Sequence, residues 1–248
     1  IQKIREPEIQ IVSNLSFLPV NENNLVYKAA RLLQEEFALT DGISVKLTKR
    51  IPVAAGMAGG STDAAAMLYA MNQLYDLGLS RRELMKRGVQ IGADVPYCLM
   101  RGTALAEGIG EKLPQPPPMI KCPVLIAKPS ISVSTKFVYQ NLKLDEQTNH
   151  PDIDALMKDI REKDFDGVCA HMGNVLESVT IPNYPVIAEI KQQMMRSGAK
   201  ASMMSGSGPT VFGLFEDGET AKRALREMKR SGLAKQVYLT TIYNNRRK

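Results

Sequence analysis

Residues 49–66 read KRIPVAAGMAGGSTDAAA, a run of small side chains between two regular hydrophobic patterns. Before it, apolar and polar residues alternate from Ile43 to Leu47, which predicts a half-buried strand. From Ser61 onward, apolar residues recur every three or four positions until Gly78. The stretch therefore predicts a strand, a glycine-rich loop and a helix that begins near Ser61.

This loop is suited to binding an anion. Amide groups at the start of a helix have no partner inside the helix, and together with the helix dipole they attract negative charge. Gly56, Gly59 and Gly60 would let the backbone approach a bulky phosphate. The hydroxyl groups of Ser61 and Thr62 can add hydrogen bonds or reach a metal ion. The spacing matches neither G-x-x-x-x-G-K-[ST] nor G-x-G-x-x-G, and a tight turn that serves only packing is the structural alternative.

Composition excludes several classes of protein. The 248 residues suffice for one large domain or two modest ones, and no apolar run approaches the ~20 residues of a membrane helix. Cys98, Cys122 and Cys169 are far apart and form no C-x-x-C pair, which argues against a disulfide framework or a zinc site. Such cysteine usage favours the reducing cytoplasm.

Charge and histidine content narrow the chemistry further. The net charge of +6 fits nucleic acid, a phosphorylated small ligand or a merely solvated basic surface. Nucleic acid is the weakest of these, because only 6% of residues are aromatic and no basic–aromatic module is present. His150 and His171 are the only histidines, so a histidine-rich metal site is excluded. A general base is then expected to be a carboxylate or a lysine.

Two carboxylates and a second glycine-rich loop are further candidates. Asp94 lies in GADVPYC, residues 92–98, just before a helix, where a turn-forming role is the structural alternative. Asp63 lies in the first turn of the helix after residue 60, where capping or the helix dipole explains it. SGSGPTVF, residues 205–212, is a glycine-rich loop that enters a strand.

The remaining pattern predicts an α+β architecture in two halves, 1–128 and 129–248. Helices are expected at 80–90, 152–162, 165–178, 185–197 and 217–231, and strands at 103–107, 124–127, 210–215 and 236–242. Helix, strand, strand, helix and strand in this order are typical of a ferredoxin-like unit. Because no flexible linker is visible, we expect the halves to pack across a cleft.

Segments 52–63, 92–96 and 205–210 together resemble the three motifs of the GHMP small-molecule kinases. The stretches NLVYKAARLL (24–33), KRIPVAAGMAGGSTDAAA (49–66), GADVPYC (92–98) and AEGIGEKL (106–113) are similar to one branch of that superfamily. Members of the branch phosphorylate 4-diphosphocytidyl-2-C-methyl-D-erythritol in the non-mevalonate isoprenoid route. The resemblance covers nearly all of the chain.

The resemblance implies a two-domain GHMP fold, with an N-terminal domain of the ribosomal-protein-S5-domain-2-like type and a ferredoxin-like C-terminal domain. It implies transfer of the γ-phosphoryl group of ATP, with Mg²⁺, to the 2-hydroxyl of the methylerythritol unit. It also implies a cytoplasmic monomer or homodimer whose partners are small molecules, without nucleic acid or membrane. The alternatives are another GHMP kinase of the mevalonate or homoserine type, or a nucleotide-binding module without turnover.

The site residues follow from the same resemblance. Asn24 and Lys49 would line the adenosine site, and Asp94 would take the proton of the substrate hydroxyl. Tyr139 would stack on the cytosine, and the backbone of Ile109 would meet the cytidine end. Gly206 and Gly208 would support substrate and phosphates. The residues expected to wrap the ATP phosphates are Pro52, Val53, Ala54, Ala55, Gly56, Met57, Ala58, Gly59, Gly60, Ser61 and Thr62.

The sequence departs from the family pattern in two places. Ala54, Ala55 and Ala58 stand near positions where the family usually has glycine, and we expect dihedral angles there that alanine permits. The family's N-terminal strand, with a catalytic lysine and a D-G-Y-H segment that holds cytosine, is not found in the printed sequence. We therefore expect the printed sequence to begin late in the family's order of motifs, and a protein without those residues to be badly impaired.

Overall fold

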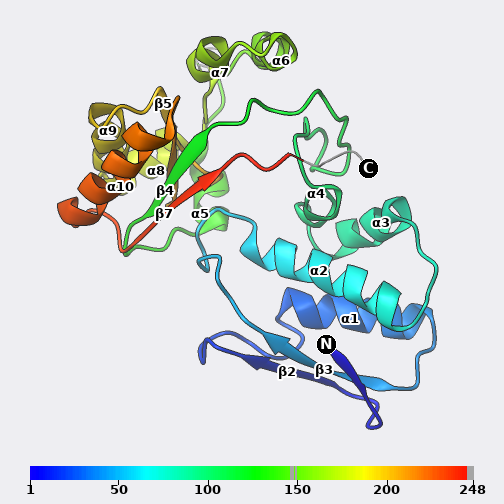
Figure 1. Cartoon of the computed structure of the whole chain (residues 1–248). Helices are drawn as coiled ribbons and strands as arrows, with labels where there is room; N and C mark the ends of the chain where they lie inside the picture. Colours follow the sequence, from blue (N-terminus) through cyan, green and yellow to red (C-terminus); the bar gives the residue numbers. More distant parts are fainter. Residues whose placement is uncertain (146–147, 149, 245–248) are drawn as a thin grey trace. The chain divides into compact units, whose positions relative to one another are not determined.

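The computed structural model describes residues 1–145, 148 and 150–244, whose contacts divide the chain into two compact units (Figure 1). The first unit consists of residues 1–53 and 58–115, and the second of residues 54–57 and 116–248. The boundary expected after residue 128 differs from the one that the contacts give. Residues 116–128 belong to the second unit because they include strand β4 (Pro123–Lys128), which lies in that unit's sheet.

The first unit, over its described residues, has a three-stranded sheet in the order β1-β3-β2 and four helices. The strands are β1 (Gln2–Ile4), β2 (Ile9–Ser13) and β3 (Gly42–Leu47). The helices are α1 (Leu25–Glu36), α2 (Gly59–Leu74), α3 (Arg81–Ile91) and α4 (Val95–Met100). β2 and β3 are parallel and α1 connects them, whereas β1 is antiparallel to β3. The strand predicted from residue 43 to residue 47 is confirmed.

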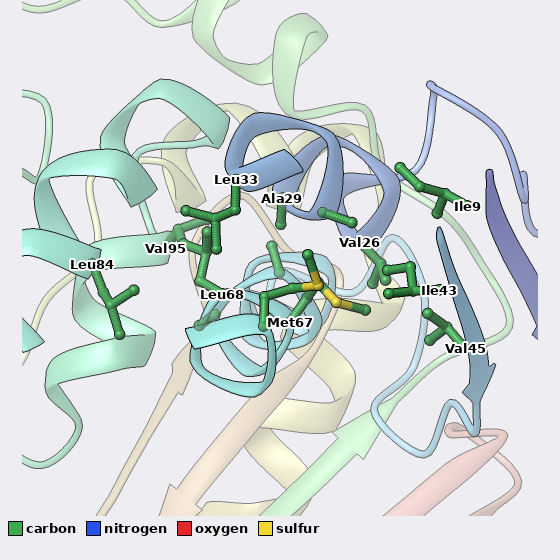
Figure 2. Packing of buried hydrophobic residues seen from close by; sticks show 14 of the residues in the cluster. Ile9, Val26, Ala29, Leu33, Ile43, Val45, Met67, Leu68, Leu84 and Val95 are labelled. Atoms are coloured by element: carbon green, nitrogen blue, oxygen red, sulfur yellow. The ribbon is translucent and has the colours of Figure 1, made fainter. Parts of the chain in front are cut away.

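One hydrophobic core joins the sheet of the first unit to its helices. Figure 2 shows buried side chains from β2, β3 and all four helices: Ile9, Ile43, Val45, Val26, Ala29, Leu33, Met67, Leu68, Leu84 and Val95. The spacing of Val26, Ala29 and Leu33 by three and four residues places them on one face of α1. Ala64 and Ala65 of α2 are buried in the same core, where α1 and α2 pack together. Close helix packing therefore explains part of the alanine-rich stretch.

The second unit has a four-stranded antiparallel sheet in the order β5-β6-β4-β7. Its other strands are β5 (Ala201–Met204), β6 (Val211–Leu214) and β7 (Gln236–Thr241). Its helices are α5 (Thr135–Asn141), α6 (Ile153–Glu162), α7 (Phe165–His171), α8 (Glu177–Asn183), α9 (Val186–Arg196) and α10 (Gly218–Ser231). The order β4, α9, β5, β6, α10, β7 confirms the ferredoxin-like unit that the sequence predicted.

The two faces of this sheet are covered by different elements, because successive strand residues point to opposite sides. On one face, Leu125 and Ala127 of β4 pack in a cluster with residues of α9 and α10. On the other face, Val124 packs with Phe165 and Cys169 of α7. The sheet is therefore covered on one side by the two helices of the ferredoxin-like unit and on the other by a helix inserted into it.

Two predicted elements differ from the structure. Residues 103–107 form no strand, and the described chain has there only an isolated bridge between Glu107 and Lys112. The helix predicted over 165–178 is interrupted after His171, because Asn174 forms a turn in which its Oδ1 accepts a 3.0 Å hydrogen bond from Leu176 N–H. Among the described residues, no helix is both long enough and apolar enough for a membrane span.

Candidate active site

Helix α2 begins earlier than the sequence predicted. Its first residue is Gly59 and its N-cap is Ala58, at φ 48° and ψ 29°, so Ser61 and Thr62 lie within the first turn. Within the described residues, no side chain caps this helix, since alanine offers no acceptor. The first hydrogen bond along the helix runs from Thr62 N–H to Ala58 O at 2.8 Å. The earlier N–H groups of the turn are thus available to an anion.

In the loop before α2, every second residue from 54 to 58 has a positive φ angle. Ala54, Gly56 and Ala58 have positive φ angles of 50°, 67° and 48°, whereas Ala55 and Met57 do not. The expectation that these alanines use ordinary dihedral angles is therefore wrong for Ala54 and Ala58. A left-handed alanine costs about 1 kcal/mol. Backbone strain of this kind is often found at ligand-binding sites, so the positive φ angles at Ala54 and Ala58 agree with the predicted binding role of the loop.

Because Gly59 and Gly60 have no side chains, side-chain atoms of neighbouring residues lie close to their backbone. A Cβ atom on Gly59 would lie 2.9 Å from Ile51 Cγ2 and 3.4 Å from Lys49 Nζ. A Cβ atom on Gly60 would lie 3.4 Å from Leu25 Cδ1. A side chain at residue 59 is thus excluded by packing whether or not a ligand is bound. Contact of these two glycines with a phosphate stays a prediction about their backbone.

Lys49 and Asp63 form an ion pair beneath the start of α2. The side chain of Lys49 is only 4% exposed and that of Asp63 is 21% exposed. The family resemblance predicts that Lys49 lines the adenosine site, and capping or the helix dipole is the role expected of Asp63. Asp63 is not a cap in the structure, because its carboxylate binds the ammonium group of Lys49.

Asn24 is the N-cap of α1 and is buried. Its Oδ1 accepts a 2.9 Å hydrogen bond from Val26 N–H, and its Nδ2 donates a 2.6 Å hydrogen bond to Pro19 O. These bonds show a structural role that the sequence analysis did not assign. The adenosine contact predicted for Asn24 stays a prediction.

Asp94 lies at the start of α4 without capping it. It is the N-cap residue at φ −83° and ψ −11°, it is exposed, and its carboxylate makes no capping hydrogen bond or ion pair within the described residues. One turn later, Cys98 Sγ lies 3.4 Å from Thr62 Oγ1 in the first turn of α2. The first turn of α2 therefore contacts α4 through Cys98, although Thr62 and Cys98 are far apart in the sequence.

The pKa of the Cys98 thiol depends on groups from both α2 and the start of α4. Burial raises its pKa, the hydrogen bond with Thr62 lowers it, and the charges of Asp94 and Asp63 raise it. Both carboxylates are thus close enough to act on one sulfur atom. In the sequence Cys98 is recognisable only as an unpaired cysteine, because no local pattern identifies a neighbour that is reached through tertiary packing.

Ile109 lies in the turn between Glu107 and Lys112. Its side chain is 71% exposed, and its N–H donates a 2.8 Å hydrogen bond to Glu111 Oε2. Gly108 and Gly110 flank it at φ angles of 68° and 106°. An exposed apolar side chain held at a tight turn is compatible with the predicted contact to the cytidine end, but the N–H group already has a partner.

The second unit contains the other glycine-rich loop and residues 54–57. Ser205 Oγ donates a 2.7 Å hydrogen bond to Gly56 O. A Cβ atom on Gly56 would overlap Ser205 O and lie 3.1 Å from Gly208 N, so glycine is needed here for loop-to-loop contact. Gly206 and Gly208 have φ angles of 56° and 85°. The two glycine-rich motifs therefore touch through Gly56.

Asn174 holds this second loop and was missed in the sequence analysis. Its Nδ2 donates hydrogen bonds of 2.8 Å to both Met204 O and Gly206 O. Thr135 Oγ1 lies 2.9 Å from Ser207 Oγ and links the loop to α5. Asn174 directly follows a glycine, a common turn signal that could have separated α7 from α8.

Tyr139 lies on α5 with its side chain in solvent. The residue is 61% exposed, whereas its neighbour Val138 is fully buried. The ring of Tyr139 is therefore not part of the hydrophobic core. The predicted stacking on cytosine stays a prediction.

Among the described residues, no group of three or more His, Cys, Asp or Glu side chains could hold a metal ion. The hydroxyl oxygens in the first turn of α2 are those of Ser61 and Thr62, and Thr62 Oγ1 donates a 3.0 Å hydrogen bond to Ala58 O. Such a donor set fits a hard cation held mainly by phosphate oxygens and water, as Mg²⁺ commonly is, with one protein hydroxyl.

Comparison with known proteins agrees with this arrangement. The family model described as the GHMP kinases N terminal domain matches residues 24–102, and the GHMP kinases C terminal model matches residues 156–234. The 4-diphosphocytidyl-2-C-methyl-D-erythritol kinase of Lachnospira eligens is 57% identical over 241 residues, which are 97% of this chain and 84% of the relative. The chain belongs to the 4-diphosphocytidyl-2-C-methyl-D-erythritol kinase family of the GHMP kinases.

Solved structures agree with that membership in the GHMP kinases. A crystal structure of 4-(cytidine 5'-diphospho)-2C-methyl-D-erythritol kinase matches with a TM-score of 0.78 and 29% identity, over 94% of this chain and 81% of that one. Homoserine kinase from Cytophaga hutchinsonii matches with a TM-score of 0.81 and 21% identity, over 98% and 83% of the two chains. The second likeness shows the GHMP fold alone.

Proposed function

We propose that this GHMP kinase transfers the γ-phosphoryl group of ATP to the 2-hydroxyl of 4-diphosphocytidyl-2-C-methyl-D-erythritol. The observation that carries the proposal is the contact between the first turn of α2 and the short helix α4. The first turn of α2 has uncapped N–H groups, and Thr62 in that turn touches Cys98, one turn after the free carboxylate of Asp94. An anion site and an acceptor for a hydroxyl proton are thus neighbours.

Phosphoryl transfer needs little covalent chemistry from the protein, so positioning and charge stabilisation dominate. The backbone of residues 52–62 and the N-terminus of α2 bind the phosphates of ATP. Mg²⁺ neutralises phosphate charge when it is bound, and Ser61 or Thr62 would supply the protein oxygen. Asp94 accepts the proton of the attacking hydroxyl, a role for which a carboxylate without an ion-pair partner in the described residues is suited.

The remaining predicted residues bind the two substrates. Asn24 and Lys49 border the adenosine, Tyr139 stacks on the cytosine, and the backbone at Ile109 meets the cytidine end. Gly206 and Gly208 support substrate and phosphates through a backbone whose positive φ angles bring it close to a ligand. Three free cysteines fit a reducing compartment, and we place the reaction in the cytoplasm.

The test is a coupled ADP-release assay of the full-length protein with ATP, Mg²⁺ and a panel of alcohols. The panel contains 4-diphosphocytidyl-2-C-methyl-D-erythritol, mevalonate and homoserine. Turnover of the first alone supports the proposal. Turnover of mevalonate or homoserine instead would assign another GHMP activity, and ATP binding without turnover of any alcohol would indicate a nucleotide-binding module.

A further inference from the structure

Lys49 is held in place from two directions. Its backbone is bound by Asn14, whose Oδ1 accepts a 2.7 Å hydrogen bond from Lys49 N–H and whose Nδ2 donates a 3.2 Å hydrogen bond to Lys49 O. Its ammonium group binds Asp63 in α2. The lysine therefore connects the segment after β3 to the beginning of α2 through two fixed ends.

The ammonium group reaches the first residue of the helix. Lys49 Nζ lies 3.4 Å from the place where a Cβ atom on Gly59 would be, and the side chain is almost fully buried. Any sideways movement of this group changes the space beneath Gly59. The position of the first turn of α2 thus depends on where Lys49 Nζ is held.

Electrostatics makes Asp63 necessary for that position. A buried ammonium group without a counter-charge is costly. Here it also lies at the amino end of α2, where the helix dipole is positive and repels a cation. Asp63 is the ion-pair partner of this group within the described part of the chain. Without it, Lys49 is expected to move away from Gly59 and toward solvent.

We propose that Asp63 is a positioning residue, which acts through Lys49 to keep the first turn of α2 where its N–H groups bind the ATP phosphates. This inference rests on the proposed function in one respect, that the anion bound at α2 is ATP. It replaces the capping or dipole role that the sequence suggested for Asp63. It also gives Lys49 a structural role at the phosphate end of the nucleotide, where it holds the first turn of α2.

The test measures ATP binding by calorimetry, in the presence of Mg²⁺, to the full chain and to three variants. These are Lys49→Met, Asp63→Asn and the double variant. Each single change is expected to raise the Kd for ATP by roughly ten- to hundredfold, the scale on which small displacements of positioning groups act. The double variant is expected to bind no more weakly than the weaker single variant, because both changes break one linkage.

Kinetics and a matched ion pair distinguish positioning from simple stabilisation. At saturating ATP, the KM for the alcohol substrate should stay within twofold of the unaltered protein. Glu36→Gln breaks the pair of Glu36 and Arg87, which joins α1 to α3 in the same unit. That control should lower the melting temperature and leave the Kd for ATP unchanged.

Three results would overturn the proposal. Unchanged or tighter ATP binding by Asp63→Asn, with weakened binding by Lys49→Met, would mean that Lys49 acts on the nucleotide without Asp63. A lowered melting temperature with unchanged ATP binding would mean a purely structural pair. If a single variant does not fold, the double variant, which leaves no unpaired buried charge, is measured instead, and an unchanged Kd for ATP in it would overturn the proposal. ATP binding by the unaltered protein without turnover of any alcohol would contradict only the proposed function.

Discussion

The four helices of the first unit, all within described residues, begin in two different ways. α1 and α3 are closed by side chains, since Asn24 accepts a 2.9 Å hydrogen bond from Val26 N–H and Ser80 accepts one of 3.3 Å from Glu83 N–H. Glu83 completes a capping box by accepting a 2.8 Å hydrogen bond from Ser80 N–H. α2 and α4 are open, because Ala58 has no acceptor and the side chain of Asp94 makes no capping bond.

The side-chain caps of α1 and α3 stabilise the fold. The uncapped starts of α2 and α4 instead leave backbone N–H groups and the Asp94 carboxylate for a ligand. Both open helices begin within the segments that resemble GHMP kinase motifs. An open start is not sufficient evidence of binding, however. In the described residues of the second unit α8 and α9 also lack a side-chain cap, and their N-cap residues are Leu176 and Pro185, whose side chains cannot accept a hydrogen bond. α4 differs from α8 and α9 because its N-cap residue, Asp94, has a carboxylate that makes no capping hydrogen bond or ion pair within the described residues.

The largest test of this comparison is Asp94→Asn. If Asp94 accepts the hydroxyl proton, kcat should fall by roughly 10²–10⁴, the usual contribution of general base catalysis. The KM values should change little because asparagine has nearly the same shape. The melting temperature should be unchanged because the carboxylate stabilises no helix. Steady-state kinetics and thermal unfolding check both, and wild-type turnover would remove Asp94 from the mechanism.

A second test concerns Tyr139, which lies on the capped helix α5 and is predicted to stack its ring on the cytosine of the substrate. Base stacking on an aromatic ring contributes roughly 1–3 kcal/mol. Tyr139→Ala should therefore weaken binding of the cytidyl substrate by about one to two decades. Binding of ATP should not change, and neither should the melting temperature, because the side chain is 61% exposed. Calorimetry with each ligand measures this.

Tyr139→Phe is the matched control for the ring. It keeps the aromatic face and should bind the cytidyl substrate nearly as well as the unaltered protein. Equal losses of ATP and cytidyl affinity in the alanine variant, or no loss of either, would contradict the stacking role.

Ser80→Ala tests the role of a side-chain cap, at the start of α3. Loss of an N-cap side chain costs about 1 kcal/mol of stability, and here a capping box is lost with it. Denaturant unfolding should show this loss, whereas kcat and both KM values should stay unchanged. A fall in kcat as large as that expected for Asp94→Asn would show that closed and open starts do not divide stability from activity.

The smallest effect is expected for Ala58→Gly at the open start of α2. Glycine adopts the positive φ of residue 58 without the strain of a Cβ atom but is more flexible when unfolded. The two terms nearly cancel, so we expect stabilisation of at most about 1 kcal/mol. Unfolding curves measure the sign, and a clear destabilisation would show that the Cβ atom of Ala58 makes a favourable contact.

Sequence patterns predicted the elements that local forces determine. The strand at 43–47, the helix expected at 80–90 and the ferredoxin-like order of the second unit are all confirmed. Hydrophobic periodicity and capping residues act over a few positions and can be recognised without tertiary structure. Family resemblance added the candidate site residues, and membership in the family is confirmed.

The features that were missed depend on partners far away in the sequence. The pairing of Lys49 with Asp63 and the contact of Thr62 with Cys98 require the packing of separate elements. The left-handed alanines at 54 and 58 contradict the local preference of alanine. Asp94 has the sequence context of a turn-forming residue, and only the geometry at α4 shows that its side chain does not cap the helix.

The assignment of Ala54–Met57 to the second unit has a consequence for fragment expression. A fragment cut before Pro116 would carry the ferredoxin-like sheet without the short segment whose Gly56 receives the hydrogen bond of Ser205. The complementary fragment would carry that segment without its partner loop. A single cut therefore cannot separate the two units cleanly, and mixing the two pieces should restore the Ser205 loop better than either piece alone.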